Sequence, residues 1–255
     1  MNQAVALPIA RPALSLFATE PWRAAKEFFS LARMESAVGG PLGDGHPVII
    51  FPGLAADGKS VAPLRKHCKS LGFEAMDWGL GFNMPPKGDA DAYIEELAEH
   101  TRAQLEPYNQ SATLIGWSLG GLYAREVAKI LGSRVRQVIT IGTPFNSGVD
   151  STNVGWLYKL ITGAEPKPDP VLMKRLRTPP SVPTLSIYSR NDGVVAWQTC
   201  RHDGTCDLTE DVEIDGSHMG MGWNPEVLQI VGERLVKTSD HGPARRARGR
   251  KPSRR

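Results

Sequence analysis

A chain of 255 residues with 41% hydrophobic residues is long enough to bury one sizeable core and has the composition of an ordinary globular protein. Its formal net charge of +3 depends on its C-terminal end, because residues 245–255 carry seven Arg and Lys and no acid, so the rest of the chain carries −4. Outside that end, nothing in the sequence supports nucleic-acid binding. The odd count of three cysteines excludes a disulfide framework, although Cys200 and Cys206 are close enough in sequence to form one disulfide or remain two thiols.

Residues 1–45 are expected to form an N-terminal amphipathic arm and a linker. Residues 13–38 have the periodicity of a helix or a pair of turns, and Thr19-Glu20-Pro21 is a helix-start signal. Packing over the domain and contact with a membrane surface are both open for this arm. The region lacks a secretory signal, and no stretch of the chain approaches the roughly 18 apolar residues of a membrane span. A cytoplasmic location is expected, with peripheral contact to an anionic membrane as the alternative.

Residues 46–238 alternate between short apolar runs and segments with helical periodicity, which predicts one α/β domain. The predicted strands are residues 47–51, 73–78, 112–117, 136–142, 182–188 and 212–214. The predicted helices are residues 60–71 and 89–108, a helix that follows Gly120, and residues 225–236. Alternation of this kind indicates a mostly parallel sheet with helices on both faces. In such sheets, functional side chains collect at the carboxyl ends of the strands.

The segment Gly116-Trp-Ser-Leu-Gly120 lies between a predicted strand and a predicted helix, which is the context of a nucleophile elbow. Ser118 would stand at the apex of a sharp, strained turn. A Cβ at position 116 or 120 would collide with the neighbouring strand or helix, so glycine is needed at both. The turn lifts the Ser118 hydroxyl above the sheet and directs the Leu119 amide to the same place.

An activated serine needs a base within hydrogen-bond reach and a carboxylate that orients that base. Asp192 follows the strand at 182–188, and His218 follows the strand at 212–214, so both are expected at the same edge as Ser118. The competing residues are expected to lie at the surface, in polar loops or in the tail. These are His46, His67, His100, His202 and His241 for the base, and Asp203, Asp207 and Asp215 for the acid.

Two backbone amides are predicted to form an oxyanion hole. The first strand ends in Phe51-Pro-Gly-Leu54, where a glycine allows the backbone to approach a reacting carbonyl. We therefore expect the Leu54 and Leu119 amides to act together.

The connection at residues 146–182 is too long for a simple loop, and we interpret it as a cap or lid over the active site. Packing down onto the domain is the alternative interpretation. The candidate substrate-binding residues are the apolar side chains of this segment and two near the elbow strands. They are Trp117, Phe145, Trp156, Leu157, Leu160 and Ile161.

Five motifs together resemble the α/β-hydrolase superfamily, and in particular its bacterial triacylglycerol lipases and esterases. The motifs are Phe51-Pro-Gly-Leu54, Gly116-Trp-Ser-Leu-Gly-Gly121, Gly142-Thr-Pro-Phe145, Asn191-Asp-Gly-Val-Val195 and Gly216-Ser-His218. The resemblance covers residues 46–236. It implies that Ser118 is the nucleophile, His218 the base and Asp192 the orienting acid. Position 52 is Pro where many secreted lipases carry His, and no calcium loop is visible.

The resemblance and the motifs together predict an esterase or lipase-like enzyme that cleaves carboxylic esters through an acyl-enzyme, with no cofactor and no metal. Acyl transfer or thioester hydrolysis is the alternative on the same fold. A further alternative is that the protein is a non-catalytic, membrane-associated binding module. Residues 239–255 are expected to be a disordered basic tail that solubilises the protein or contacts a polyanion such as an anionic membrane. The expected partner is a small or lipid-like ester.

Overall fold

The structure is a computed structural model, and it describes residues 9–31, 42–84, 88–146, 170–204 and 206–239. Within these ranges, six strands form one parallel sheet in the order β2-β1-β3-β4-β5-β6. The strands are β1 (Pro47–Phe51), β2 (Glu74–Asp77), β3 (Ala112–Trp117), β4 (Val135–Ile141), β5 (Thr184–Tyr188) and β6 (Thr209–Glu213). The central strands read as nearly continuous apolar runs because a parallel sheet is buried on both faces.

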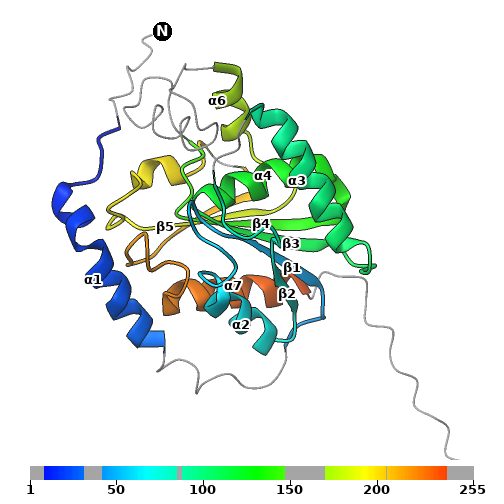
Figure 1. Ribbon diagram of the computed structural model, residues 1–255, viewed down its shortest axis with the longest axis horizontal. Coiled ribbons are helices and arrows are strands. Elements are labelled where there is room, and N and C mark those ends of the chain that lie inside the picture. The colour runs from blue at the N-terminus through cyan, green and yellow to red at the C-terminus, as the bar shows by residue number, and fades with distance from the viewer. Residues whose placement is uncertain (1–8, 32–41, 85–87, 147–169, 205, 240–255) are drawn as a thin grey trace, which may run out of the picture.

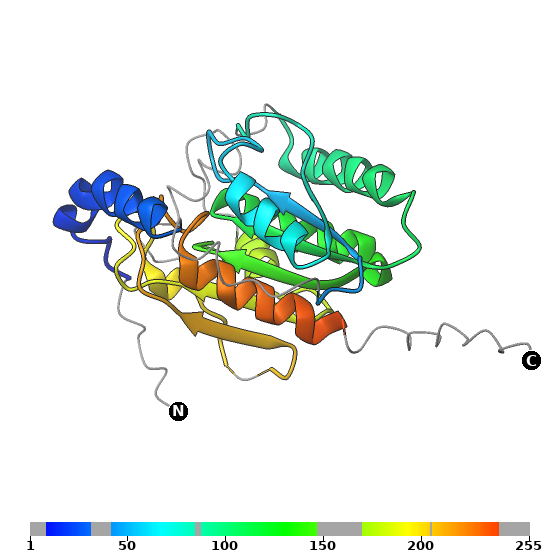
Figure 2. The ribbon, with the colours of Figure 1, turned by 90° about the horizontal axis from the view of Figure 1, so that it is seen from below.

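Helices cover both faces of this sheet (Figures 1 and 2). They are α1 (Leu14–Leu31), α2 (Ala62–Ser70), α3 (Ala90–Leu105), α4 (Leu119–Leu131), α6 (Pro170–Arg177) and α7 (Pro225–Ser239), with short 3-10 turns η1 (Gly132–Arg134) and η2 (Trp197–Cys200). One hydrophobic cluster joins α3, α4 and α6 to one face of the sheet, and a second joins α2 and α7 to the other. The α/β-hydrolase fold class predicted from the sequence is therefore confirmed for the sheet and its two helical layers.

The pleat of β1 explains how one strand serves both layers. Ile49 and Phe51 belong to the cluster with α3 and α4, whereas Val48 and Ile50 belong to the cluster with α2 and α7. Successive side chains of a strand point to opposite faces, so four consecutive apolar residues are needed. All four side chains are fully buried.

The predicted bounds of the elements agree with the observed ones to within a few residues, except in α1. At α3, the side chain of Asp89 accepts a hydrogen bond from the Ala92 amide at 2.8 Å and so caps the helix. Helix α1 instead begins at Leu14 and contains Pro21 in its interior, so the expected start at Thr19 is wrong. The Thr19 hydroxyl donates to the Ser15 carbonyl at 2.9 Å, which is an interaction within a helix and not a cap.

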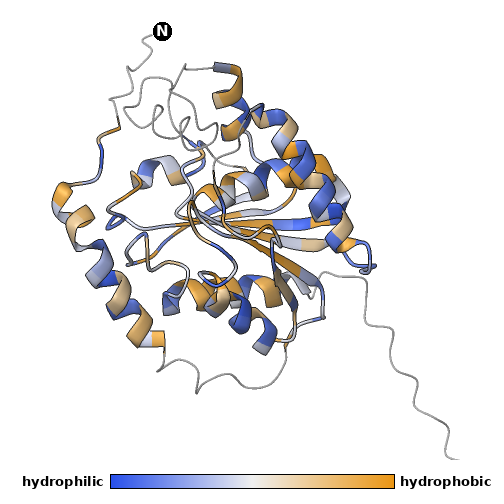
Figure 3. Cartoon of the chain, viewed as in Figure 1, coloured by the Kyte–Doolittle hydropathy of each residue, from blue (hydrophilic) through white to orange (hydrophobic). Residues whose placement is uncertain are grey.

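Helix α1 packs on the domain through its polar side. Glu20 and Ala24 are its buried residues. Most of the large apolar side chains of this helix are exposed, among them Trp22 (70%) and Phe29 (75%). Figure 3 shows hydrophobic segments alternating with hydrophilic ones along this helix. Apolar contacts of α1 with the domain come from Leu31, which packs against the cluster of α2 and α7, and from the Phe28 ring, 6.1 Å from that of Trp223. The hydrogen bonds of its buried side are described with the site below.

Several expectations concern residues beyond the described ranges. Most of the segment predicted as a cap or lid, residues 147–169, lies outside them, as do residues 1–8 and the basic tail from residue 240 onward. Cys68, Cys200 and Cys206 are free thiols in this structure, so Cys200 and Cys206 follow the second of the two alternatives that the sequence left open. Among the helices that the structure describes, none combines the length and the hydropathy needed to cross a bilayer.

Candidate active site

Ser118 occupies the sharp turn between β3 and α4. Its backbone angles, φ 53° and ψ −120°, are rare for a residue with a side chain and store strain at this point. A Cβ on Gly120 would lie 2.3 Å from the Phe51 carbonyl oxygen, and one on Gly116 would lie 2.3 Å from Gly121 Cα. The predicted collision with the neighbouring strand or helix is therefore confirmed. Two glycines permit the close packing that holds the strained serine.

Three side chains from three loops meet above the carboxyl ends of the strands. His218 Nε2 lies 3.0 Å from Ser118 Oγ, and His218 Nδ1 lies 2.6 Å from Asp192 Oδ2. All three residues are buried, with exposed fractions of 3–6%. A carboxylate can only accept, so Asp192 fixes the proton on Nδ1 and leaves Nε2 free to accept the serine proton. The structure thus brings together the serine, base and acid that the sequence singled out.

Asp192 is itself held by its own loop. Its Oδ1 accepts hydrogen bonds from the amides of Val194 at 2.8 Å and Val195 at 2.6 Å. These bonds leave Oδ2 to face the imidazole. The Asn-Asp-Gly-Val-Val motif therefore supplies both the carboxylate and the two amides that orient it.

The pKa of His218 is raised above its ordinary value of 6.5. Burial alone would lower this pKa, but the charge of Asp192, its hydrogen bond to the ring and the charge of Glu20 together outweigh burial. The raised pKa favours the protonated imidazolium form of His218. A general base needs this property, because it must hold a proton between two steps of a reaction.

The loop after β1 lies against the elbow, as an oxyanion hole requires. A Cβ on Gly53 would lie 3.5 Å from Ser118 Cβ. Asn83 holds this loop: its side-chain amide donates to the Pro52 carbonyl at 2.7 Å, and its main-chain carbonyl accepts from the Ala55 amide at 2.7 Å. The role of the Leu54 and Leu119 amides stays a prediction. Asn83 was not found from the sequence because it follows β2 and no local pattern links it to the first loop.

The two candidate substrate-binding residues that the structure describes are both buried. The indole of Trp117 donates to the His218 carbonyl at 3.2 Å, so it supports the loop of the base. Phe145 is fully buried, and its ring packs 3.9 Å from the guanidinium of Arg125. The other four, Trp156, Leu157, Leu160 and Ile161, lie outside the described residues.

His46 is not the surface histidine that the sequence suggested. It is fully buried, with Nδ1 2.6 Å from Asp44 and Nε2 2.9 Å from the Thr113 hydroxyl. Burial, together with the charge of Arg136, lowers the pKa of His46 to about 4. Its partners lie at the amino ends of the strands, so it belongs to the framework and not to the triad.

His202 also departs from the surface position expected for it. Its Nδ1 lies 2.6 Å from Asp211, and its Nε2 lies 3.0 Å from the Arg125 guanidinium. The second nitrogen thus accepts from a cation and is not paired with a serine. His67 and His100 are partly buried, and the latter lies 2.9 Å from the Trp78 carbonyl. His241 lies outside the described residues.

Sequence reasoning missed two carboxylates that α1 brings to the loops of the triad. Glu20 accepts from the amides of Gly193, His218 and Met219, and Glu27 accepts from the Ser217 amide at 2.7 Å. Glu20, Ala24 and Glu27 are spaced i, i+4 and i+7, so they share one face of the helix. That narrow polar stripe was the available signal. It was obscured by the larger number of apolar residues around it.

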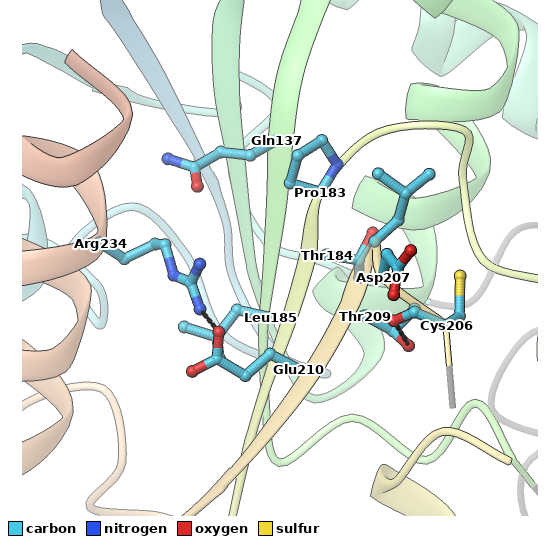
Figure 4. A pocket seen from close by; sticks show the side chains of 10 residues that line it. Gln137, Pro183, Thr184, Leu185, Cys206, Asp207, Thr209, Glu210 and Arg234 are labelled. Atoms are coloured by element: carbon cyan, nitrogen blue, oxygen red, sulfur yellow. Dashed lines mark hydrogen bonds and ion pairs between the residues drawn. The ribbon is translucent and has the colours of Figure 1, made fainter. Parts of the chain in front are cut away.

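A separate small hollow of about 200 Å³ lies at the amino ends of β5 and β6, away from the triad. Figure 4 shows Gln137, Thr184 and Glu210 on its walls, with Arg234 of α7 directed at Glu210. The Arg234 guanidinium and the Glu210 carboxylate are paired with each other. Within the described ranges, no group of three or more His, Cys, Asp or Glu side chains is placed to hold a metal ion.

Comparison with known proteins gives three kinds of match. A family model described as the alpha/beta hydrolase fold matches residues 46–160. A pimeloyl-[acyl-carrier protein] methyl ester esterase of Shewanella woodyi is 27% identical over 103 residues, which is 40% of this chain but only 38% of that esterase.

Two solved structures are similar in fold. Aspergillus fumigatus lipase B has a TM-score of 0.58 at 19% identity, over 79% of this chain and 56% of that one. A lipase of Bacillus licheniformis in its mature form has a TM-score of 0.55 at 16% identity, over 78% of this chain and 94% of that one. At these identities the structural matches show the fold alone.

Proposed function

We propose that this chain, which has the α/β-hydrolase fold and resembles lipases and esterases, is a serine hydrolase that cleaves carboxylic esters. The observation that carries this proposal is the continuous hydrogen-bonded series from Asp192 through His218 to Ser118 on a strained elbow. Nucleophile, base and orienting acid with this geometry have the roles of a catalytic triad.

In the proposed acylation step, Ser118 Oγ attacks the ester carbonyl carbon while His218 Nε2 takes the serine proton. The carbonyl oxygen becomes an oxyanion, which the Leu54 and Leu119 amides stabilise by about 3 kcal/mol for each donor. Asp192 stabilises the imidazolium that forms. His218 then gives the proton to the alkoxide, which leaves as the alcohol. Ser118 remains as its acyl ester.

Deacylation repeats the same chemistry with water. His218 takes a proton from water, whose oxygen attacks the acyl carbon and forms a second oxyanion. Collapse of this intermediate breaks the bond to Ser118 Oγ, which receives the proton from His218. The products are a carboxylic acid and the free enzyme, and neither half-reaction as written draws on a cofactor.

We propose that the acyl group is apolar and of medium length. Two apolar side chains stand exposed beside the catalytic groups: Leu54 (39%) follows the glycine of the β1 loop, and Met219 (43%) follows the base. Apolar side chains at this rim favour an acyl chain over a charged acid. The curated protein that matches part of this chain is named as a methyl ester esterase of a pimeloyl-[acyl-carrier protein], which supports an acyl ester as the substrate class.

The test is hydrolysis of p-nitrophenyl esters from acetyl to palmitoyl. We expect kcat/KM to pass through a maximum at a medium chain length. Each added methylene group that enters the pocket is expected to stabilise the bound substrate by about 0.8 kcal/mol, until the pocket is filled. Equal rates for all chain lengths would contradict an apolar acyl pocket. If no ester is cleaved but acyl thioesters are, the enzyme is a thioesterase on the same fold.

The pH dependence of kcat/KM follows from the raised pKa of His218. The base must be neutral in the free enzyme, and a raised pKa keeps it protonated to a higher pH. We therefore expect kcat/KM to fall on the acid side with a midpoint above 6.5. A pH–rate profile with a buffer control measures this midpoint, and a midpoint below 6.5 would show that burial dominates the environment of the imidazole.

A further inference from the structure

Glu20 is the most deeply buried residue of α1, with an exposed fraction of 1%. Its Oε1 accepts from the Gly193 amide at 2.8 Å and from the His218 amide at 3.0 Å. Its Oε2 accepts from the Met219 amide at 2.9 Å. A carboxylate is buried at great cost unless its oxygens find donors, and three amides meet that requirement here.

The three amides belong to the two loops that must meet for the triad to form. Gly193 follows Asp192 directly, and His218 is the base itself. The bond of 2.6 Å between Asp192 and the imidazole depends on the relative placement of these loops. Glu20 is a single group bound to both. A shift of either loop by 1 Å would break this bond or the one to Ser118.

Other contacts of α1 hold Glu20 in this position. Arg23 donates to Glu20 Oε1 at 2.8 Å and to the Asn191 carbonyl at 2.6 Å, so it also reaches the loop of the acid. Trp223 donates through its indole to the Ala24 carbonyl at 2.9 Å. The backbones are in close contact as well, because a Cβ on Gly193 would lie 2.6 Å from the Leu16 carbonyl oxygen.

The charge of Glu20 also acts on the base. Of the charged groups around the loop of His218, Asp192 and Glu20 are the carboxylates that raise its pKa. The other charged groups there are Arg23 and Glu27 of α1, Asp215 of the loop itself and Glu226 of α7. Glu27 lies on the same face of α1 and accepts from the neighbouring Ser217 amide. Glu27 therefore offers a matched comparison, because it is a carboxylate of the same helix that binds the same loop but does not contact His218.

We propose that Glu20 is a positioning residue of this active site, which joins the acid loop to the base loop through the amides of Gly193, His218 and Met219. The expected effect of Glu20 on catalysis rests on the proposed serine-hydrolase function. Its effect on the geometry of the two loops is independent of any substrate. Helix α1 is then a part of the catalytic apparatus although it precedes the first strand of the sheet.

The test compares Glu20→Gln with Glu27→Gln in the full chain. Glutamine keeps the size of the side chain but removes the charge and replaces one acceptor oxygen with a donor group, so at least one amide of the loops loses its partner. We expect Glu20→Gln to lower kcat/KM about tenfold, mainly through kcat, and to move the acid-side midpoint to lower pH. Glu27→Gln is expected to keep the wild-type midpoint.

A second readout needs no substrate. The pKa of His218 can be followed by NMR in protein with isotope-labelled histidine, and the resonance can be assigned among the six histidines with a His218→Gln variant. Glu20→Gln is expected to lower this pKa and Glu27→Gln to leave it unchanged. If the wild type proves inert on every ester, this titration still decides the role of Glu20. Identical titrations for both variants would overturn it.

Glu20→Asp separates placement from charge and also serves if Glu20→Gln fails to fold. It retains the carboxylate but is one methylene shorter, so it cannot span the same three amides. We expect it to keep an acid-side midpoint closer to that of the wild type than Glu20→Gln does and to lose kcat. Wild-type kcat in Glu20→Asp would contradict a positioning role that depends on the length of the side chain. Thermal unfolding of each variant excludes loss of the fold as the cause.

Discussion

Replacement of Ser118 by alanine is expected to lower kcat for ester hydrolysis by a factor on the order of 10⁴ to 10⁶. The variant loses the atom that attacks the substrate, while the Leu54 and Leu119 amides and the imidazole remain. Residual activity would come from those groups alone. The fold is expected to persist, because alanine occupies the same backbone position and leaves the Ser118 amide bonded to the Ile141 carbonyl at 2.8 Å.

A matched control is Ser70→Ala. Ser70 lies on the exposed side of α2, where its hydroxyl donates to the His67 carbonyl, and its loss is expected to leave kcat unchanged. A fluorophosphonate reagent followed by mass spectrometry should label Ser118 in the wild type and in the Ser70 variant. Labelling of another serine, or full activity in Ser118→Ala, would remove Ser118 from the mechanism.

Replacement of Gly120 by alanine is expected to have the largest effect on stability. The added Cβ would lie 2.3 Å from the Phe51 carbonyl oxygen and 2.4 Å from that of Pro52, and backbone atoms cannot rotate away as a side chain does. We expect the free energy of unfolding to fall by about 3 kcal/mol. In a chain of this size that change lowers Tm by roughly 6 to 12 °C. Relief of the clash would also push the loop of Leu54 away from Ser118, so activity should fall as well.

Gly222→Ala is the control for this prediction. A Cβ there would meet its nearest neighbour, the Ser60 carbonyl oxygen, at 3.4 Å, which is near ordinary contact. Its Tm is expected to stay within about 2 °C of the wild type. Thermal unfolding by circular dichroism measures both variants. Equal Tm values for the two would mean that the elbow can open at little cost.

Local signals were sufficient to predict the sheet and the loops that bring Ser118, Asp192 and His218 together. Apolar runs such as 47–51 must be buried on both faces of a parallel sheet. The close turn around Ser118 requires glycine at positions 116 and 120, because a side chain there would collide with the backbone. Each of these signals lies within a few residues of the feature that it predicts. Parallel connections then bring the carboxyl ends of the strands to one edge, which is why Asp192 and His218 could be matched to Ser118 across long stretches of sequence.

The features that sequence reasoning missed depend on partners far along the chain. His46 can be buried because both ring nitrogens have hydrogen-bond partners: Nδ1 contacts Asp44 and Nε2 contacts the Thr113 hydroxyl. Thr113 is 67 residues away in the sequence. Glu20 is buried because of amides that lie 173 to 199 residues later. Helical periodicity assumes that the apolar side of a helix faces the protein. In α1 that assumption fails for Trp22 and Phe29, and backbone donors from two loops bind the buried carboxylates of its opposite side.

The attachment of α1 has a consequence for how the protein is made. At about 5 to 20 residues per second, a ribosome needs roughly 10 to 40 s to add the 199 residues that separate Glu20 from Met219. Throughout that interval the helix has been synthesised, but at least one of the two loops that it binds is still incomplete. Trp22 and Phe29 remain on the solvent side even after docking. We therefore expect α1 to dock after the sheet has formed, so that the loops of Asp192 and His218 come into register only once the chain has been synthesised beyond Met219.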